Sequence, residues 1–285
     1  MSFILGFSIV MGSILISFYL MGGNLLSLLQ FGEIGIILGT AIGALVISTP
    51  FSIFPAILND LKKVFQKDQY PEIFYTELLV TMFQILKIMR QGLEKLEPLV
   101  ENPHENEIFQ NHKLVSGNEH VMTFLCDHLR VVIMGLGSSH EIENLIHEEI
   151  ETYERDCEAV NSALTNMADG FPAFGIVAAV LGVIITMASI DQPPAILGKL
   201  LAGALVGTFL GIFFAYGLVG PVAKLIERRH MEEAHYMSCI KNALVSFLGG
   251  NSAYTAVEMA RKSLPKRIRP SFQSLESSLQ NNSGN

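Results

Sequence analysis

The chain has 285 residues, of which half are apolar and only 16% are charged, and its mean hydropathy is +0.41. Soluble domains carry roughly 25% charged residues, so this composition excludes an ordinary soluble protein and favours a membrane protein. The net charge of −8 also argues against nucleic acid as a partner, because a phosphate backbone is bound by basic surfaces.

Four stretches are long and apolar enough to cross a bilayer, whose hydrocarbon core requires about 20 apolar residues in a helix. They cover residues 2–21, 34–57, 171–190 and 200–223, and none of them contains Asp, Glu, Lys, Arg or His. The first has no basic segment before it, so we interpret it as a helix rather than a signal peptide. The sequence therefore predicts an all-α, polytopic membrane protein with four transmembrane helices.

The distribution of basic residues predicts how the chain is oriented. Of the 19 Lys and Arg residues, only Lys199 lies in the two short connections between the paired spans. Because basic residues collect on the cytoplasmic side of a membrane, we expect both large polar regions and both termini to lie in the cytoplasm.

The polar regions show the periodicity of helices. Apolar residues recur at steps of three and four between Phe74 and Leu93, and similar patterns begin at Gly117-Asn118 and at His140. We divide the chain into transmembrane helices 1 and 2 (1–57), a helical cytoplasmic loop (58–170), transmembrane helices 3 and 4 (171–223), cytoplasmic C-terminal helices (224–263) and a disordered tail (264–285).

Small residues spaced four apart line three of the spans: they are glycines in spans 2 and 4, and Gly175 with Ala179 in span 3. Small residues at this spacing allow helix backbones to approach closely in lipid. Packing within one subunit and packing between subunits are both consistent with the pattern. The glycines concerned are Gly35, Gly39, Gly43, Gly175, Gly203, Gly207 and Gly211.

No pattern in the sequence indicates an enzyme, a cofactor or a metal site. The motifs HExxH, GxSxG and GxxxxGK[ST] are absent. His140 and His147, or His230 and His235, are spaced to share a helix face, but without other ligands we interpret them as solvated or packed side chains. The three cysteines have no paired spacing, so we expect free thiols.

Polar chemistry in the membrane is limited to hydroxyls and helix ends. A protein that moves ions usually places an ionisable residue in the bilayer, so any such carboxylate must come from another chain. Thr208 lies in the second glycine ladder, where its hydroxyl is also able to bond the carbonyl four residues earlier. Pro172 follows Asp169 closely, and its ordinary structural interpretation is a proline in the first turn of a helix.

Several segments, taken together, resemble the MotA family of flagellar stator membrane subunits. The resemblance covers roughly residues 1–250. Spans 3 and 4 resemble those of the family in DGFPAFGIVAAVLGV and GALVGTFLGIFFAYGLVGPVA, and the first two spans in LGFSIVMGSILISFYLMGGNLLSLLQFGEIGIILGTAIGALV. The loop segments RQGLEKLEPLVENPHENEIF and HEEIETYE resemble the family's charged loop and acidic helix.

The resemblance implies a stator subunit of the bacterial inner membrane. In this family the subunits form a ring, taken to be a pentamer, around two copies of MotB, which supplies a membrane aspartate and a peptidoglycan anchor. Ion flow between the two proteins turns the ring, which pushes on the rotor protein FliG. The absence of a membrane carboxylate in this chain fits that division of labour.

Residue by residue, the resemblance assigns roles to positions of this chain. Pro172 matches the span 3 proline beside the ion site, Asp169 the acid before it, and Pro221 the proline near the cytoplasmic end of span 4. Sodium-driven relatives have a threonine where this chain has Ala179, and both classes keep the threonine of Thr208. Alanine offers no oxygen ligand, so we expect protons rather than sodium.

For the rotor contact, Arg90 and Glu97 match the charged pair that engages FliG, and Glu149 lies in the acidic helix. The seven-residue spacing of Arg90 and Glu97 is also that of an ordinary stripe on one helix. Pro98 departs from the family's pattern, and we expect it to end the helix of Arg90 early.

Two other interpretations remain open at this point. An energiser of the ExbB/TolQ type is a related proton-driven ring, but it usually has three spans rather than four. A membrane scaffold without ion coupling would use the glycine ladders for packing alone. The joint occurrence of PAFG, the span 4 ladder and the RQG…ENP loop favours the stator.

Overall fold

The computed structural model describes residues 2–66, 70–135 and 138–281. Every regular element in these ranges is a helix and none is a strand, so the predicted all-α class is confirmed. The chain divides into two compact units: unit 1 comprises Met1–Lys67 and Asp156–Arg229, and unit 2 comprises Asp68–Arg155 and His230–Asn285. Helices α9 (Ser139–Ala188) and α11 (Gly220–Leu248) contribute residues to both units.

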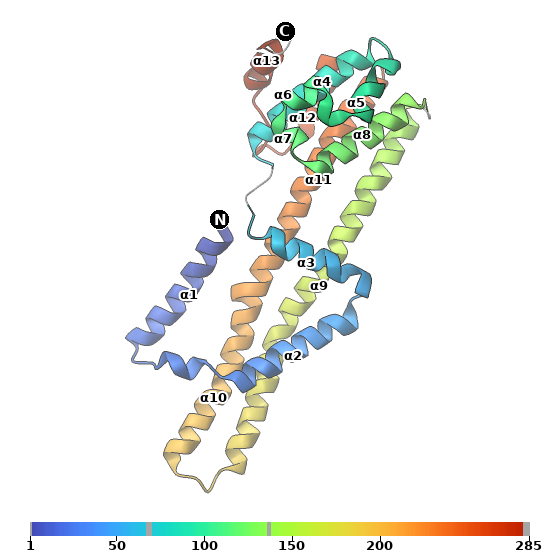
Figure 1. The fold of residues 1–285 in the computed structure, drawn as a ribbon. Helices are drawn as coiled ribbons and strands as arrows, with labels where there is room; N and C mark the ends of the chain where they lie inside the picture. The colour runs from blue at the N-terminus through green and yellow to red at the C-terminus, as the bar shows by residue number, and fades with distance from the viewer. Residues whose placement is uncertain (1, 67–69, 136–137, 282–285) are drawn as a thin grey trace. The chain divides into compact units, whose positions relative to one another are not determined.

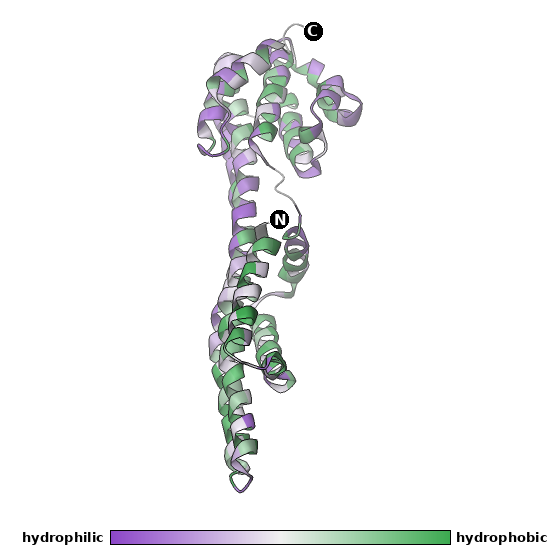
Figure 2. Ribbon diagram, turned by 90° about the vertical axis from the view of Figure 1, so that its left-hand side faces the viewer, coloured by the Kyte–Doolittle hydropathy of each residue, from purple (hydrophilic) through white to green (hydrophobic). Residues whose placement is uncertain are grey.

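Unit 1 contains the apolar helices. Among the described residues, four helical stretches are long and apolar enough to cross a membrane, which confirms the predicted number. Figure 1 shows α10 running beside the later part of α9, and Figure 2 shows that apolar residues predominate along both. Besides its parts of α9 and α11, unit 1 contains α1 (Ser2–Leu20), η1 (Leu25–Leu28), α2 (Phe31–Ser48), η2 (Phe51–Ile53), α3 (Phe54–Lys63), α10 (Pro194–Ile212) and the π-helix η5 (Phe213–Val219).

The second span ends earlier than the predicted 34–57, because the apolar stretch that the structure shows runs from Leu25 to Ser48. Helix α2 ends at Ser48, and Thr49 is extended, with φ −123° and ψ 128°. Pro50 explains the break, because a proline disfavours the helical conformation of the residue before it. The residues beyond the break begin a separate amphipathic helix, α3, which carries Lys62 and Lys63 in its last turn.

The third and fourth spans are parts of much longer helices. Helix α9 continues through Pro172 without interruption, although a span beginning at 171 was expected. The expected fourth span, 200–223, lies within a helical run from Pro194 to Leu248. In both cases the helix continues from the apolar into the polar sequence, so composition marks the spans but not the ends of the helices.

Unit 2 is a bundle of shorter helices around α4 (Glu72–Met89). The side chains of Phe74, Leu78, Met82 and Ile85 are each at most 1% exposed. Fully burying one such side chain stabilises a fold by roughly 1.5–3 kcal/mol. The other elements are η3 (Leu93–Leu96), α5 (Glu97–Glu101), η4 (Pro103–Glu105), α6 (Glu107–Asn111), α7 (Lys113–Ser116), α8 (Glu119–Ile133), α12 (Ala253–Ser263) and α13 (Phe272–Asn281).

The prediction that 264–285 is disordered is wrong for most of that segment. Residues 272–281 form α13, which packs on α4 with Leu275 and Leu279 each only 4% exposed. The two leucines are four residues apart and form one apolar stripe within a polar composition. Arg267 also donates a hydrogen bond of 3.0 Å to the buried Glu232. Residues 282–285 lie outside the described part of the chain.

Candidate functional site

In unit 1, α9 and α10 touch backbone to backbone. A β-carbon on Gly211 would lie 2.6 Å from the Phe171 carbonyl oxygen, and one on Gly175 would lie 2.8 Å from that of Gly207. Real β-carbons essentially never come that close, so these positions accept only glycine. Gly207 and Gly211 of the span 4 ladder therefore pack within the chain, against Gly175 and its neighbours.

Pro172 lies in the interior of α9, so the first-turn interpretation is wrong. Proline has no N–H, and the carbonyl of Ala168, four residues earlier, consequently lacks its usual helical donor. Pro172 is partly buried, whereas Asp169 is exposed. Such a carbonyl in a membrane helix is stable only where another group, water or an ion satisfies it.

Thr208 offers a second polar group on α10. Its side chain is partly buried, and among the described residues its hydroxyl makes no hydrogen bond. By contrast, the hydroxyl of Thr186 donates to the carbonyl of Gly182 at 2.9 Å, as expected for a threonine that satisfies itself. Thr208 is therefore free to bond another molecule. Ala179 of α9 lies beside Gly207, the residue before Thr208, because a β-carbon on Gly207 would lie 3.2 Å from the Ala179 nitrogen.

Span 4 contains a π-helix that the sequence analysis missed. In η5 the backbone widens to five-residue spacing, and Gly220 N–H donates to the Ala215 carbonyl. This segment ends just before Pro221, which cannot donate to the carbonyl of Gly217 as an α-helical residue would. The pair Gly220-Pro221 was a usable signal, since π turns inside α-helices often occur at functional sites. Pro221 itself is exposed.

The ladder on α2 differs from the one on α10. No atom of the described residues lies within 4 Å of a β-carbon built on Gly35, Gly39 or Gly43. On α10, Gly203 lies near only the side chain of Gln30, with the closest atom 3.5 Å away. The α2 glycines therefore form an open stripe on unit 1, available to another molecule.

In unit 2, Arg90 and Glu97 lie on different elements, so the interpretation as one helical stripe is wrong. Arg90 caps the end of α4, and Glu97 opens α5. Gly92, with φ +141°, reverses the chain between them, a backbone conformation that favours glycine. The expectation that Pro98 ends the helix of Arg90 is also wrong, because α4 ends before Gly92 and Pro98 lies in the first turn of α5.

The charges of Arg90 and Glu97 both point into solvent. Each residue is exposed, and no ion pair to either occurs within the described ranges. Lys95, which lies between them in sequence, donates a hydrogen bond of 3.0 Å to Gln91. The two charges are thus open to solvent and are not paired with each other.

Glu149 of α9 is in contact with a buried histidine of α8. Its Oε2 lies 3.2 Å from Nε2 of His128, whose side chain is 2% exposed while that of Glu149 is 49% exposed. The contact lacks the alignment of a hydrogen bond. Sequence reasoning missed His128, because one histidine in an amphipathic helix gives no signal of its own.

Glu149 also lines a pocket of about 370 Å³ between α8, α9 and α11. Three other carboxylates, those of Glu119, Asp127 and Glu233, line the same pocket. Asp127 accepts a hydrogen bond from Arg130 at 2.6 Å, and Glu233 accepts one from the Tyr153 hydroxyl at 2.7 Å. Burial raises the pKa of Tyr236 at the same wall.

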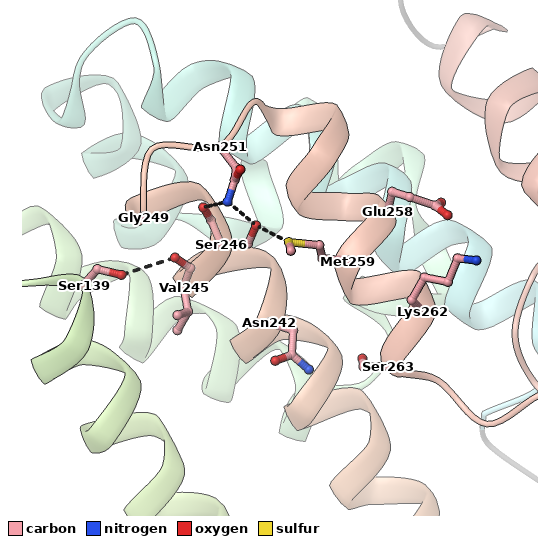
Figure 3. Close-up of a pocket in the computed structure, with 10 residues that line it drawn as sticks. All are labelled: Ser139, Asn242, Val245, Ser246, Gly249, Asn251, Glu258, Met259, Lys262 and Ser263. Atoms are coloured by element: carbon pink, nitrogen blue, oxygen red, sulfur yellow. Dashed lines mark hydrogen bonds between the residues drawn. The ribbon is translucent and has the colours of Figure 1, made fainter.

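A larger pocket of unit 2, of about 590 Å³, contains none of the predicted site residues. Figure 3 shows it between the start of α9, the end of α11 and α12, with Ser139 bonded to the Val245 carbonyl and Asn251 to Ser246. Most of its polar side chains are bonded locally, and we assign it no role.

The remaining histidines and cysteines are consistent with structural roles. His147 lies 3.3 Å from Glu151 on the exposed face of α9, and burial lowers the pKa of His235. The predicted free thiols are confirmed for all three cysteines. Burial raises the pKa of Cys126 to about 11 and that of Cys239 to about 12. Within the described chain, no three potential ligands gather as a metal site would require.

Two family models match the chain. The Motility protein A N-terminal model matches residues 4–92, and the MotA/TolQ/ExbB proton channel family model matches residues 117–239. Arg90 falls in the first match, and Glu149, Pro172 and Thr208 fall in the second. The second family is one of channel proteins, so the chain is not an enzyme.

Known proteins match over nearly the whole length. Motility protein A of Escherichia coli (strain K12) is 38% identical over 277 residues, which is 97% of this chain and 94% of that protein. Chemotaxis protein LafT of Vibrio parahaemolyticus is 32% identical over 256 residues, with 90% of each chain covered.

Solved structures show the same fold. The structure of C. jejuni MotAB aligns with a TM-score of 0.79 and 25% identity, covering 95% of this chain and 98% of that one. The flagellar MotAB stator complex from Bacillus subtilis aligns with a TM-score of 0.74 and 23% identity, covering 94% and 98%. Together with the glycine-packed membrane helices and the matches above, these results show that the chain belongs to the motility protein A family.

Proposed function

We propose that the chain is the membrane subunit of a flagellar stator, which pairs with a MotB-type protein and couples ion flow to rotation. One observation carries the proposal: the four predicted apolar spans offer polar groups but no charge. Between Phe171 and Ile190 there is no Asp, Glu, Lys, Arg or His, yet Pro172 deprives a carbonyl of its donor, and the Thr208 hydroxyl makes no hydrogen bond to any described residue. A partner that brings one carboxylate would complete an ion site.

The ion pathway runs along the wall formed by Pro172, Ala179 and Thr208, with Asp169 and Pro221 towards its cytoplasmic end. Protonation of the partner's aspartate removes a charge from a low-dielectric site and so changes which contacts are favourable. A dehydrated sodium ion needs several oxygen ligands, and Ala179 supplies none from its side chain. The transported ion is therefore the proton.

The rotor contact uses Arg90 and Glu97, with Glu149 as a further acid. Exposed ion pairs contribute only about 0–1 kcal/mol each and are screened by salt. Such weak pairs suit a contact with FliG that forms and breaks at every step. The exposure of both charges, and their separation by Gly92, supports an external partner.

The assembly is a ring of these subunits, a pentamer around two MotB chains, in the bacterial inner membrane. The open glycine stripe of α2 supports contacts between subunits, since nothing in the described part of the chain covers it. Unit 2 and both termini lie in the cytoplasm, in line with the basic residues of 58–170 and of the segment after 220.

The test is swimming in soft agar. A flagellated bacterium that lacks its own stator subunit is complemented with this chain and its MotB partner, and with Pro172→Leu or Arg90→Glu variants. We expect the native chain to restore swimming, and the variants to build flagella that turn weakly or not at all. Lys95→Glu, a reversal of a neighbouring exposed charge, serves as the control.

A native chain that inserts and binds its partner but does not support swimming would overturn the proposal. An ExbB/TolQ-type energiser would instead restore a proton-driven envelope function. A scaffold would tolerate Pro172→Leu. Swimming that stops when sodium is withdrawn, at constant proton motive force, would overturn the choice of the proton alone.

A further inference from the structure

The environment of His128 fixes which of its ring nitrogens carries a proton. Nδ1 lies 2.7 Å from the carbonyl oxygen of Phe124, one helical turn earlier on α8. A carbonyl oxygen only accepts hydrogen bonds, so Nδ1 must donate. The ring of Phe124 packs on the imidazole, with centroids 4.3 Å apart, and holds it in this orientation.

With Nδ1 protonated, the state of Nε2 decides how His128 acts on Glu149. An unprotonated Nε2 would place its lone pair near the Glu149 oxygen 3.2 Å away, although not aligned with it, and two acceptors repel. A protonated Nε2 makes the ring an imidazolium and the contact an attraction between opposite charges. Nothing else in the described chain bonds Nε2, so Glu149 is its partner.

We infer that His128, in its protonated form, is a positioning residue that holds the carboxylate of Glu149 at the edge of the acidic pocket. A buried cation needs a counter-charge, and Glu149 is the carboxylate in contact. Loss of the proton removes the attraction and frees the half-exposed Glu149 side chain. The position of Glu149 therefore follows the protonation state of His128.

The surroundings determine which other groups influence this pair. Besides Glu149, the pocket wall includes Glu119, His120 and Asp127 of α8, Tyr153 of α9, and Glu233 and Tyr236 of α11. Asp127 is held by Arg130 and Glu233 by Tyr153. These two carboxylates therefore have partners other than Nε2 of His128.

A matched control exists on the same helix. His147 and Glu151 of α9 lie 3.3 Å apart, but their side chains are 54% and 45% exposed. Water competes for both members of that pair, so its electrostatic coupling is screened. His147→Gln therefore removes a histidine–glutamate contact that is similar in length to that of His128 and Glu149 but is exposed to solvent.

The pairing is tested directly by ¹⁵N-histidine solid-state NMR of the complex in bilayers, titrated over roughly pH 5.5 to 8.5. The His128 signals are assigned from their loss in His128→Gln. We expect Nδ1 to stay protonated throughout while Nε2 titrates. Glu149→Gln should weaken proton binding at His128 about tenfold, the low end for removal of a contacting charge. His147→Gln should leave the titration unchanged.

Two NMR results would overturn the inference: a neutral His128 that carries its proton on Nε2, or a titration unaffected by Glu149→Gln. Because Glu149 is half exposed, that variant also avoids the folding risk of replacing buried His128. The effect on rotation rests on the proposed function and needs its own measurement. Motor speed is recorded while a permeant weak acid lowers internal pH, in native cells and in His128→Gln, Glu149→Gln and His147→Gln variants.

We expect the speeds of the His128→Gln and Glu149→Gln motors to depend on internal pH in the same altered way, with His147→Gln matching native. If the NMR coupling is present but all four motors respond alike, the pairing stands and the rotor role given to Glu149 under the proposed function fails. If the coupling is absent, the pairing fails whatever the motors do.

Discussion

A β-carbon placed on Gly211 would stand 2.8 Å from the Cα of Gly175. Helices α9 and α10 therefore meet at a point where neither helix has room for a methyl group. This contact holds the two polar features of the membrane wall, Pro172 and Thr208, on adjoining helices.

We predict that Gly211→Ala destabilises the packing of α9 on α10. Overpacking a close contact usually costs about 1–3 kcal/mol, and here the obstacle is backbone, which cannot rotate away. Thermal unfolding of the purified complex should show a lower midpoint, and swimming should weaken. Gly198→Ala, on the same helix with nothing within 4 Å, should unfold like the native protein; equal midpoints for the two variants would contradict the packing argument.

A second prediction concerns the open glycine stripe of α2. Gly39→Ala meets no atom of its own chain, so the fold of the subunit should be unaffected. If the stripe packs against another subunit or MotB, the added methyl group should shift the purified complex towards smaller species. Native mass spectrometry measures that shift, and an unchanged assembly would show that the stripe faces lipid.

Charge reversal at Arg90 or Glu97 should reduce torque without reducing stability. Both residues are exposed and unpaired within the described chain, so their loss removes no internal contact. Tethered-cell rotation measures torque, and membrane abundance reports folding. Motors that contain the Lys95→Glu variant should produce native torque. If a variant with the charges of both Arg90 and Glu97 reversed produced native torque, their assignment to the rotor contact would be wrong.

The pH dependence of stability in unit 2 should include a contribution from Glu258. Two hydrogen bonds from Arg261, each 2.7 Å long, lower the pKa of this carboxyl. Its contribution is complete above the ordinary carboxyl pKa of about 4.3 and is lost as pH falls through the lowered value. Glu258→Gln should therefore unfold at a lower temperature than native at neutral pH, and the difference should shrink in acid. Glu101→Gln, at an exposed acid, should show no such trend.

Thiol labelling should distinguish the three cysteines. Cys126 and Cys239 are buried, and burial raises their pKa to about 11 and about 12, which keeps both thiols protonated and unreactive near neutral pH. Cys157 is only partly buried. A maleimide should therefore modify Cys157 alone in the native complex and all three thiols in denaturant, with mass spectrometry as the readout. Rapid labelling of Cys239 would contradict the packing of α11.

Local sequence signals predicted much of the helical framework. The apolar steps after Phe74 and the Asn118 start of α8 reappear in the structure, where the Asn118 side chain accepts from Val121 N–H at 3.3 Å. These features depend on neighbours in sequence, which periodicity and capping describe well. Composition likewise located the four apolar stretches.

The departures arise where tertiary contacts outweigh local rules. Pro172 does not end α9, because packing against α10 supports the helix on both sides of it. Leu275 and Leu279 order a segment that is polar on average, since they meet an apolar face of α4. His128 and Glu149 are 21 residues apart in sequence, and only the packing of α8 on α9 brings them together.

The predicted site was recovered unevenly for the same reason. Exposed Arg90 and Glu97 could be named by resemblance, but Gly92 places them on separate elements, which spacing alone cannot reveal. The π-helix before Pro221 was also missed, because a one-residue change of register leaves composition unaltered.

The π-helix η5 determines where the fourth span can gain or lose a residue. A π turn holds one more residue than the α-helix it interrupts, and each residue turns an α-helix by about 100°. Deleting one residue between Phe213 and Val219 would restore α-helical register there, with Pro221 then left to break it. Single-residue insertions and deletions among related genes should therefore collect at this point of the fourth span, and a scan of one-codon deletions through 200–223 would show whether motility tolerates them best there.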